Sequence, residues 1–257
     1  GDANGDGTRD AIDDEFVELY NDSCSDLDIS GYTISDSSQE RHVFPTPTIV
    51  PPNGVVVVFG GGTPTGDFGS AIVQTASTGS MVLNNGGDSV IVENPSGTPV
   101  IEFISSDFAL DFGDNQSITR SPDISGNYDL HNNANASLDY SPGTAVDGTA
   151  ITNIMTWTGA VDTDWSNAGN WDTSSVLTNA AAIIPDVANQ PVINETDAIQ
   201  IKILSLENNA SLMVEGDLNV DKCINNNGNI TFKSNSSTTA QLDEFNGEIT
   251  GSGDVTV

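Results

Sequence analysis

The sequence predicts an all-β protein in which an antiparallel β-sandwich is followed by a β-solenoid-like or second β-rich unit. Apolar residues come in short, strand-length clusters rather than with a helical period. Asn, Asp, Ser, Thr and Gly, which favour turns and oppose helices, fill much of the remaining chain. With 257 residues, the chain has room for one large β domain or two of ordinary size.

The first expected domain, residues 1–148, opens with an acidic loop and continues into strands separated by tight turns. In the first strand, Val17 and Leu19 should lie on one face and Phe16 and Tyr20 on the other, because side chains alternate along a strand. Turns rich in glycine, proline and asparagine between the strands favour an antiparallel sandwich. The expected strands are centred on residues 15–20, 29–34, 55–59, 81–83, 90–93 and 100–104.

Residues 149–155 are expected to form a linker to a β-solenoid-like module at residues 156–257. The three tryptophans, Trp157, Trp165 and Trp171, all fall near the start of this module. We interpret them as a cap or small core rather than as an exposed platform for sugars. Apolar pairs then recur between corners rich in Asn and Gly, as in the coils of a solenoid. No terminal cap is evident, so we expect that the module is truncated at its C-terminus.

The charge of the chain restricts its partners. Six basic residues stand against 37 acidic ones, which gives a net charge of −31. Nucleic-acid binding depends on neutralising phosphates, so neither nucleic acid nor anionic lipid is an expected partner. The chain contains no apolar segment typical of a signal peptide or a membrane span, and we expect no membrane insertion. Divalent cations are the natural partners, while solubility or salt tolerance is the alternative explanation of the acidity.

The sharpest motif is the N-terminal acidic loop, which reads D-x-N-x-D-G-x-x-D-x-x-D. This is the spacing of an EF-hand-type or dockerin-like calcium loop, in which alternate positions supply oxygen ligands. The twelfth position is Asp rather than Glu and no flanking helices are expected, so we predict a free-standing Ca²⁺ loop. The alternative is a solvated acidic turn. The expected ligands are the side chains of Asp2, Asn4, Asp6 and Asp13, the carbonyl of Thr8, and Asp10 directly or through water.

No catalytic constellation is recognisable, and we expect that the protein is not an enzyme. His42 and His131 form no His-Glu-x-x-His array, and no Gly-x-Ser-x-Gly elbow occurs. The glycines at 60–62 follow an apolar strand, but without a Lys-Ser/Thr ending they predict a hairpin loop rather than a phosphate loop. Carboxylate pairs for glycoside hydrolysis stay open, because spacing in sequence does not give spacing in space.

Several segments of the first domain together resemble the lamin tail domain. They are residues 14–21 (DEFVELYN), 27–36, 44–45, 52–59, 83–90, 116–120 and 141–143. The resemblance covers about residues 1–148 and implies an immunoglobulin-like β-sandwich. It also implies a non-catalytic module of a large extracellular bacterial protein.

The start of the second domain is similar to modules of secreted Bacteroidetes-type proteins. The similarity rests on Trp157, Trp165, the Gly169-Asn170-Trp171 segment and the Ile183-Ile184-Pro185 segment. Proteins of that kind commonly leave the cell by the type IX secretion route. The resemblance therefore implies an extracellular or cell-surface location in a bacterium.

These observations predict a non-catalytic, calcium-binding structural or adhesive segment of a large extracellular protein. Its partners would be calcium, neighbouring domains of the same larger chain, and a surface glycan or another surface protein. The alternative is an accessory glycan-binding module of a secreted polysaccharide-active enzyme, and a third reading is a β-helix enzyme acting on polysaccharides. The only cysteines, Cys24 and Cys223, are expected as separate thiols, although the sequence leaves their pairing open.

Overall fold

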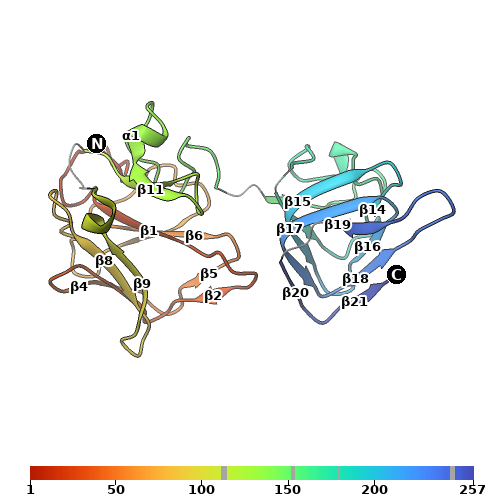
Figure 1. Cartoon of the computed structure of the whole chain (residues 1–257), viewed down its shortest axis with the longest axis horizontal. Helices are drawn as coiled ribbons and strands as arrows, with labels where there is room; N and C mark the ends of the chain where they lie inside the picture. Colours follow the sequence, from red (N-terminus) through yellow and green to blue (C-terminus); the bar gives the residue numbers. More distant parts are fainter. Residues whose placement is uncertain (111–114, 152–153, 179, 244–246) are drawn as a thin grey trace. The chain divides into compact units, whose positions relative to one another are not determined.

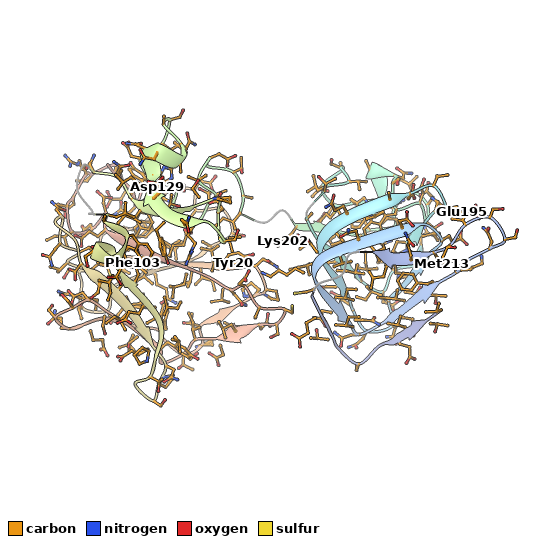
Figure 2. The ribbon with its side chains drawn as sticks, viewed as in Figure 1. Tyr20, Phe103, Asp129, Glu195, Lys202 and Met213 are labelled. Carbon is orange, nitrogen blue, oxygen red and sulfur yellow. The ribbon has the colours of Figure 1, made fainter. Side chains whose placement is uncertain are left out.

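The computed structural model describes residues 1–110, 115–151, 154–178, 180–243 and 247–257, and these are almost entirely β-structure (Figure 1). The chain divides into two compact units, Gly1–Ile151 and Thr152–Val257. Side chains fill the interior of each unit (Figure 2). The all-β prediction is confirmed. In the part of the chain that is described, no helix has the length and apolar character needed to cross a membrane.

The first unit is a β-sandwich with short additional strand pairs. Its main sheets have the orders β1–β6–β7 and β4–β3–β8–β9, and the further pairs are β2–β5 and β10–β11. All pairs are antiparallel except β6–β7, which is parallel. The strands are β1 (Phe16–Tyr20), β2 (Leu27–Asp28), β3 (Thr33–Ser35), β4 (Glu40–Val43), β5 (Ile49–Val50), β6 (Val55–Phe59), β7 (Ile72–Thr75), β8 (Ser89–Glu93), β9 (Pro99–Ile104), β10 (Ile118–Ser121) and β11 (Asn127–Leu130); the helical turns are η1 (Ser105–Phe108) and α1 (His131–Ala134).

The side-chain alternation of β1 and β6 divides the interior of this unit into two clusters. Val17 packs with Val56 and Val58 in the cluster between the main sheets, and Leu19 packs against it. Phe16 and Tyr20 pack instead against the cluster that contains Phe59 and Phe68. The predicted division of β1 into two faces is therefore confirmed. All five residues of β6 are buried, because this central strand is covered on both faces.

Two local predictions for the first unit are wrong. Residues 81–83 form no strand, and Val82 has a positive φ of 52°, which interrupts an extended backbone. The glycines at 60–62 do not form a hairpin loop, because β6 and β7 pair in parallel and their connection must cross over. The sequence pattern gives strand positions but not the direction in which neighbouring strands run.

The second unit is a stack of parallel β coils. Its two sheets have the orders β12–β13–β15–β17–β19, with β20 also paired to β17, and β14–β16–β18–β21. Apolar residues stack between coils: Leu212 is opposite Ile230, Ile201 is opposite Val220, and all four are buried. The predicted solenoid-like architecture is confirmed. The elements are β12 (Ile154–Thr156), η2 (Ala168–Asn170), β13 (Ala181–Ile184), β14 (Val192–Ile193), β15 (Ala198–Leu206), β16 (Ser211–Val214), β17 (Asp217–Asn226), β18 (Asn229–Phe232), β19 (Gln241–Asp243), β20 (Glu248–Thr250) and β21 (Asp254–Thr256).

The three tryptophans form part of the core of the second unit. Trp157, Trp165 and Trp171 are 1%, 0% and 2% exposed, and the ring of Trp171 lies edge-on to both others at 5.0 and 4.8 Å between centroids. The indole N–H of Trp157 donates to the carbonyl of Asn189 at 2.7 Å. The interpretation as a small core is confirmed. None of the three rings offers a face to a sugar.

The cysteines differ from the expectation. Neither Cys24 nor Cys223 is a free thiol, since both are disulfide-bonded. The prediction of two separate thiols is therefore wrong.

Candidate metal loop

The N-terminal acidic loop is curled by hydrogen bonds from its own backbone. The N–H of Gly7 donates to Asp2 Oδ2 at 2.9 Å, that of Asp6 to Asn4 Oδ1 at 3.0 Å, and that of Thr8 to Asp6 Oδ1 at 2.9 Å. The bonds of Asp6 and Thr8 are Asx-type bonds, which stabilise turns, and the bond from Gly7 to Asp2 closes a wider curl of the backbone. The curl brings the side chains of Asp2, Asn4 and Asp6 to the inside of the loop.

One oxygen of Asp2 remains without a partner. Its Oδ1 is buried and accepts no hydrogen bond, although Oδ2 is bonded to Gly7. Nearby, Asn4 is fully buried and its amide nitrogen lies 3.5 Å from Asp6 Oδ2. A buried polar atom without a partner costs about 1–3 kcal/mol, and more when it is charged. The loop therefore lacks a positive or donating group at Asp2 Oδ1.

The remaining predicted ligands are placed differently. Thr8 and Asp10 are exposed, and Asp10 Oδ1 accepts the N–H groups of Ile12 at 2.8 Å and Asp13 at 3.2 Å. These two N–H groups lower the pKa of Asp10 below its ordinary value. Asp13 is half-buried and lies against Gly61 of the β6–β7 connection. The structure thus brings three of the six predicted ligands together and leaves Asp10 turned towards backbone.

Asp14 is a residue of this loop that sequence reasoning missed. Its two oxygens accept the N–H of Asn4 at 3.0 Å and that of Asp10 at 2.7 Å, so it joins the two ends of the loop. It directly follows the twelfth position of the motif. The sequence shows only that one more carboxylate follows the motif before the first strand. The motif spacing does not distinguish this carboxylate from the other acidic residues around it.

The glycine-rich connection between β6 and β7 forms the second wall of the loop. Thr65 donates its N–H to the carbonyl of Asn4 at 2.9 Å and its hydroxyl to the carbonyl of Gly5 at 2.7 Å. A Cβ atom on Gly62 would lie 2.6 Å from the amide nitrogen of Asn4 and 3.0 Å from Asp6 Oδ2. Glycine is required there both by this close approach and by a φ of 72°.

The end of the first unit also contacts the loop. Arg9 donates to Asn115 Oδ1 at 2.6 Å. Burial raises the pKa of the Tyr140 phenol, and the nearby carboxylates of Asp2 and Asp14 raise it further. The loop is thus held between the β6–β7 connection and the segment after β9.

A strict carboxylate cluster is not present. Across the described ranges, no three His, Cys, Asp or Glu side chains are grouped so that they could hold a metal ion. Asp2, Asp6, Asp10 and Asp14 all accept backbone N–H groups, and Asp2 differs from the others in having a buried oxygen without a partner. Any cation here would depend on amide and backbone oxygens as well, which Ca²⁺ accepts.

Both histidines have structural hydrogen bonds. His42 Nε2 lies 2.9 Å from Gln74 Oε1, and its Nδ1 accepts the N–H of Ser77 at 3.2 Å. The ring nitrogens of His131 lie 2.9 Å from the carbonyl of Leu138 and 3.0 Å from Ser141 Oγ. These hydrogen bonds tie each histidine to a neighbouring segment of the first unit.

The fold and the loop define an all-β protein that combines an immunoglobulin-like sandwich with a parallel β-solenoid-like unit. Residues 1–105 match the family model of the Lamin Tail Domain, and residues 156–257 match that of a Domain of unknown function (DUF8693). The first match ends at residue 105 rather than near 148. No curated protein matches the chain.

Proposed function

We propose that this protein is a non-catalytic, calcium-binding structural segment of a larger extracellular or cell-surface bacterial protein. The observation that carries the calcium part is the buried, unpartnered Oδ1 of Asp2 inside a loop with EF-hand-like spacing. A bound cation would satisfy this oxygen together with Asp6 and the side-chain oxygen of Asn4 after a small rearrangement. Backbone carbonyls and water would supply further ligands, since Ca²⁺ takes six to eight oxygens in flexible geometry.

Calcium would act on the sandwich by stiffening contacts between distant segments. The loop already bonds to Thr65 and to Asn115, so an ion inside it would hold residues 2–10 against both regions. The net charge of −31 supports a cationic partner, because neutralising a crowded acidic loop removes self-repulsion in the folded state.

We propose a location outside a bacterial cell, because calcium is abundant enough there to fill sites of modest affinity. The similarity of the second domain to modules of secreted Bacteroidetes-type proteins supports secretion by the type IX route. Adhesion through the solenoid-like unit, to a surface glycan or another surface protein, belongs to the same proposal. The tryptophan platform on which the glycan-binding alternative depended is absent, since all three rings are buried. Labelling of intact cells with an antibody to the chain tests the location: labelling only after lysis would refute it.

The test of calcium binding is a thermal melt in calcium, in magnesium and in chelator. Calcium at about 100 times its dissociation constant would stabilise the folded state by about 2.7 kcal/mol. For a unit of about 150 residues this corresponds to a rise of about 5–10 °C in Tm. Magnesium should give a smaller rise, because it demands a stricter octahedral geometry than this loop offers.

A matched pair of variants makes the test specific. Asp2→Asn/Asp6→Asn should remove the calcium-dependent rise, while Asp26→Asn/Asp221→Asn removes two exposed carboxylates elsewhere and should retain it. Equal rises in both variants would show that calcium acts only by screening the overall charge. No rise in the natural protein would refute the proposed site.

A further inference from the structure

Residues 115–151 have a hydrogen-bond network of their own and are called the cover segment below. Within the described chain, its strands β10 and β11 pair with each other and belong to neither main sheet. The buried ring of His131 lies 3.0 Å from Ser141 Oγ, and the N–H of His131 donates to the carbonyl of Ser117 at 2.9 Å. The N–H of Ser117 donates to the carbonyl of Asp139 at 2.9 Å. These bonds tie the two halves of the segment together, which makes it a local cooperative unit.

A cavity of about 800 Å³ lies between the cover segment and β1. Its lining includes all five residues of β1 and, from the cover segment, residues 115–120, 123–124 and 140–141. Protein interiors are normally close-packed, with few voids larger than a water molecule. The cover segment is therefore packed loosely against the sandwich, and a region with few buried apolar contacts opens at a lower free energy than the core.

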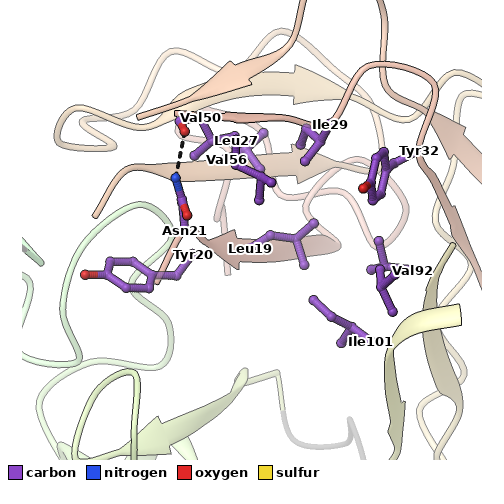
Figure 3. Close-up of a pocket in the computed structure, with 11 residues that line it drawn as sticks. Leu19, Tyr20, Asn21, Leu27, Ile29, Tyr32, Val50, Val56, Val92 and Ile101 are labelled. Atoms are coloured by element: carbon purple, nitrogen blue, oxygen red, sulfur yellow. Dashed lines mark hydrogen bonds between the residues drawn. The ribbon is translucent and has the colours of Figure 1, made fainter. Parts of the chain in front are cut away.

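A smaller apolar pocket of about 80 Å³ adjoins this cavity. Leu19 and Ile101 line both, and Figure 3 shows their side chains with that of Val92 around the pocket. Ile101 is 44% exposed. The cover segment therefore does not complete a close-packed core over this part of the sandwich.

The charges that line the cavity oppose closure of the cover segment. The Oε2 atom of Glu15 is buried without a partner. Burial raises the pKa of the Glu18 carboxyl group to about 7, and the charge of Asp123 on the cover segment supports this rise. Burying a charged group is costly, and water at these groups would remove that cost. Among the described residues that line the cavity, the carboxylates are Asp10, Asp14, Glu15, Glu18, Asp22 and Asp123, and the guanidinium groups are Arg9 and Arg120.

Two hydrogen bonds attach the cover segment to the acidic loop. Asn115 accepts from Arg9 at 2.6 Å, and the hydroxyl of Tyr140 accepts the backbone N–H of Asp2. The ring of Tyr140 also packs against the cluster that contains Ala3 of the loop. Asp2 is thus both a proposed calcium ligand and a contact of the cover segment. An ion held by its side chain would fix the backbone to which Tyr140 is bonded.

Two further contacts join the cover segment to the sandwich. The N–H of Gly143 donates to Glu18 Oε2 at 2.6 Å. The ring of Tyr128 lies edge-on to those of Phe103 and Phe108, at 4.7 and 4.9 Å between centroids. The N–H of Gly143 loses its partner on β1 when the segment opens, so its exchange with solvent reports the opening.

We propose that the cover segment opens and closes over β1 as a unit, and that calcium bound in the acidic loop holds it closed. The calcium part rests on the proposed function. The ion binds the loop more tightly while Tyr140 holds Asp2, so the closed state gains the difference in binding free energy. By reciprocity, closure of the cover segment raises the affinity of the loop for calcium by the same factor.

Hydrogen exchange of the full chain, followed by NMR at one pH and corrected for intrinsic rates, tests the opening. In chelator, the amide of Gly143 should exchange about tenfold or more faster than that of buried Val58 on the central strand β6. Its exchange should also depend less on urea, because local opening exposes less surface than unfolding. Equal rates with equal urea dependence would show that only unfolding of the whole unit exposes Gly143, and this would overturn the proposal.

Calcium added to the same sample tests the control of the opening. Saturating calcium should slow exchange at Gly143 by about 5- to 150-fold, the usual range for coupling between two sites. Isothermal titration calorimetry measures the binding itself. Binding without slower exchange would overturn this inference and leave the proposed calcium site standing, whereas absence of binding would overturn both.

A pair of double variants tests the two hydrogen bonds to the loop. Tyr140→Phe/Asn115→Gly removes both bonds and keeps an aromatic ring at position 140. Tyr32→Phe/Asn209→Gly is the matched control, because Asn209 is also an asparagine with positive φ and lies outside the cover segment. The first variant should reduce the effect of calcium on Gly143 exchange to less than about threefold, and the control should retain the full effect. Equal calcium effects in the two variants would contradict the coupling.

Discussion

Glu18 provides a direct test of how the first unit is held together. Its side chain leaves β1 towards the segment after β11 and accepts the N–H of Gly143 at 2.6 Å. Burial raises its pKa to about 7, opposed by the bond from Gly143 and supported by the charge of Asp123. In the unfolded chain the same carboxyl group should have its ordinary value.

The raised pKa sets the sign of a pH dependence. A carboxyl group whose pKa is higher in the folded state stabilises that state fully below its unfolded value, and this contribution is lost as the pH rises through the folded value. The window therefore runs from about 4.5 to about 7. At about 1.4 kcal/mol for each pKa unit the loss is at most about 3 kcal/mol, since the side chain retains some contact with solvent.

Glu18→Gln removes the charge and keeps an oxygen that accepts from Gly143. The variant should match the natural protein near pH 4.5 and be more stable by up to about 3 kcal/mol at pH 8. All four tyrosines lie in the first unit and all three tryptophans in the second, so tyrosine near-ultraviolet signals during urea unfolding report the first unit. A stability difference that stays constant between pH 4.5 and 8 would refute the assigned titration.

Three further substitutions test contacts of the two units by urea unfolding. Gly62→Ala should destabilise the first unit by about 1–3 kcal/mol more than Gly97→Ala, because both have positive φ but only Gly62 would bring its Cβ against other side chains; equal effects would contradict the close approach. Trp165→Ala should destabilise the second unit by about 3–5 kcal/mol without changing tyrosine signals of the first. Arg41→Met should cost about 3–5 kcal/mol by leaving the buried charge of Asp36 without its ion-pair partner. Asp36→Asn in the same chain should restore much of this loss, because it removes the charge and keeps the oxygen that accepts from Ser38 and Gln39; no restoration would argue against an ion-pair origin.

The sequence predicted correctly those strands that a short local run of apolar residues defines. The run at 55–59 predicted β6 with its bounds, because five consecutive apolar residues suit a strand covered on both faces. The alternation in β1 gave the correct faces. Residues 81–83 failed because their apolar character reflects burial of Met81 in the core rather than an extended backbone.

The candidate loop was only partly predictable for a related reason. Motif spacing gave the curl of residues 2–8, which depends on bonds between near neighbours. Asp14 and Gly62 were not recognised, since their roles depend on contacts with segments that the motif does not contain.

The contact between the acidic loop and Thr65 joins residues 60 positions apart in the chain. Because the contact closes a loop of that length, we expect it late in folding, after most loop-closure entropy has been lost. Interactions absent from the transition state change the unfolding rate and leave the folding rate almost unaltered. Calcium bound at this loop would therefore slow the unfolding of the protein. It would leave the folding rate of newly made chains almost unchanged.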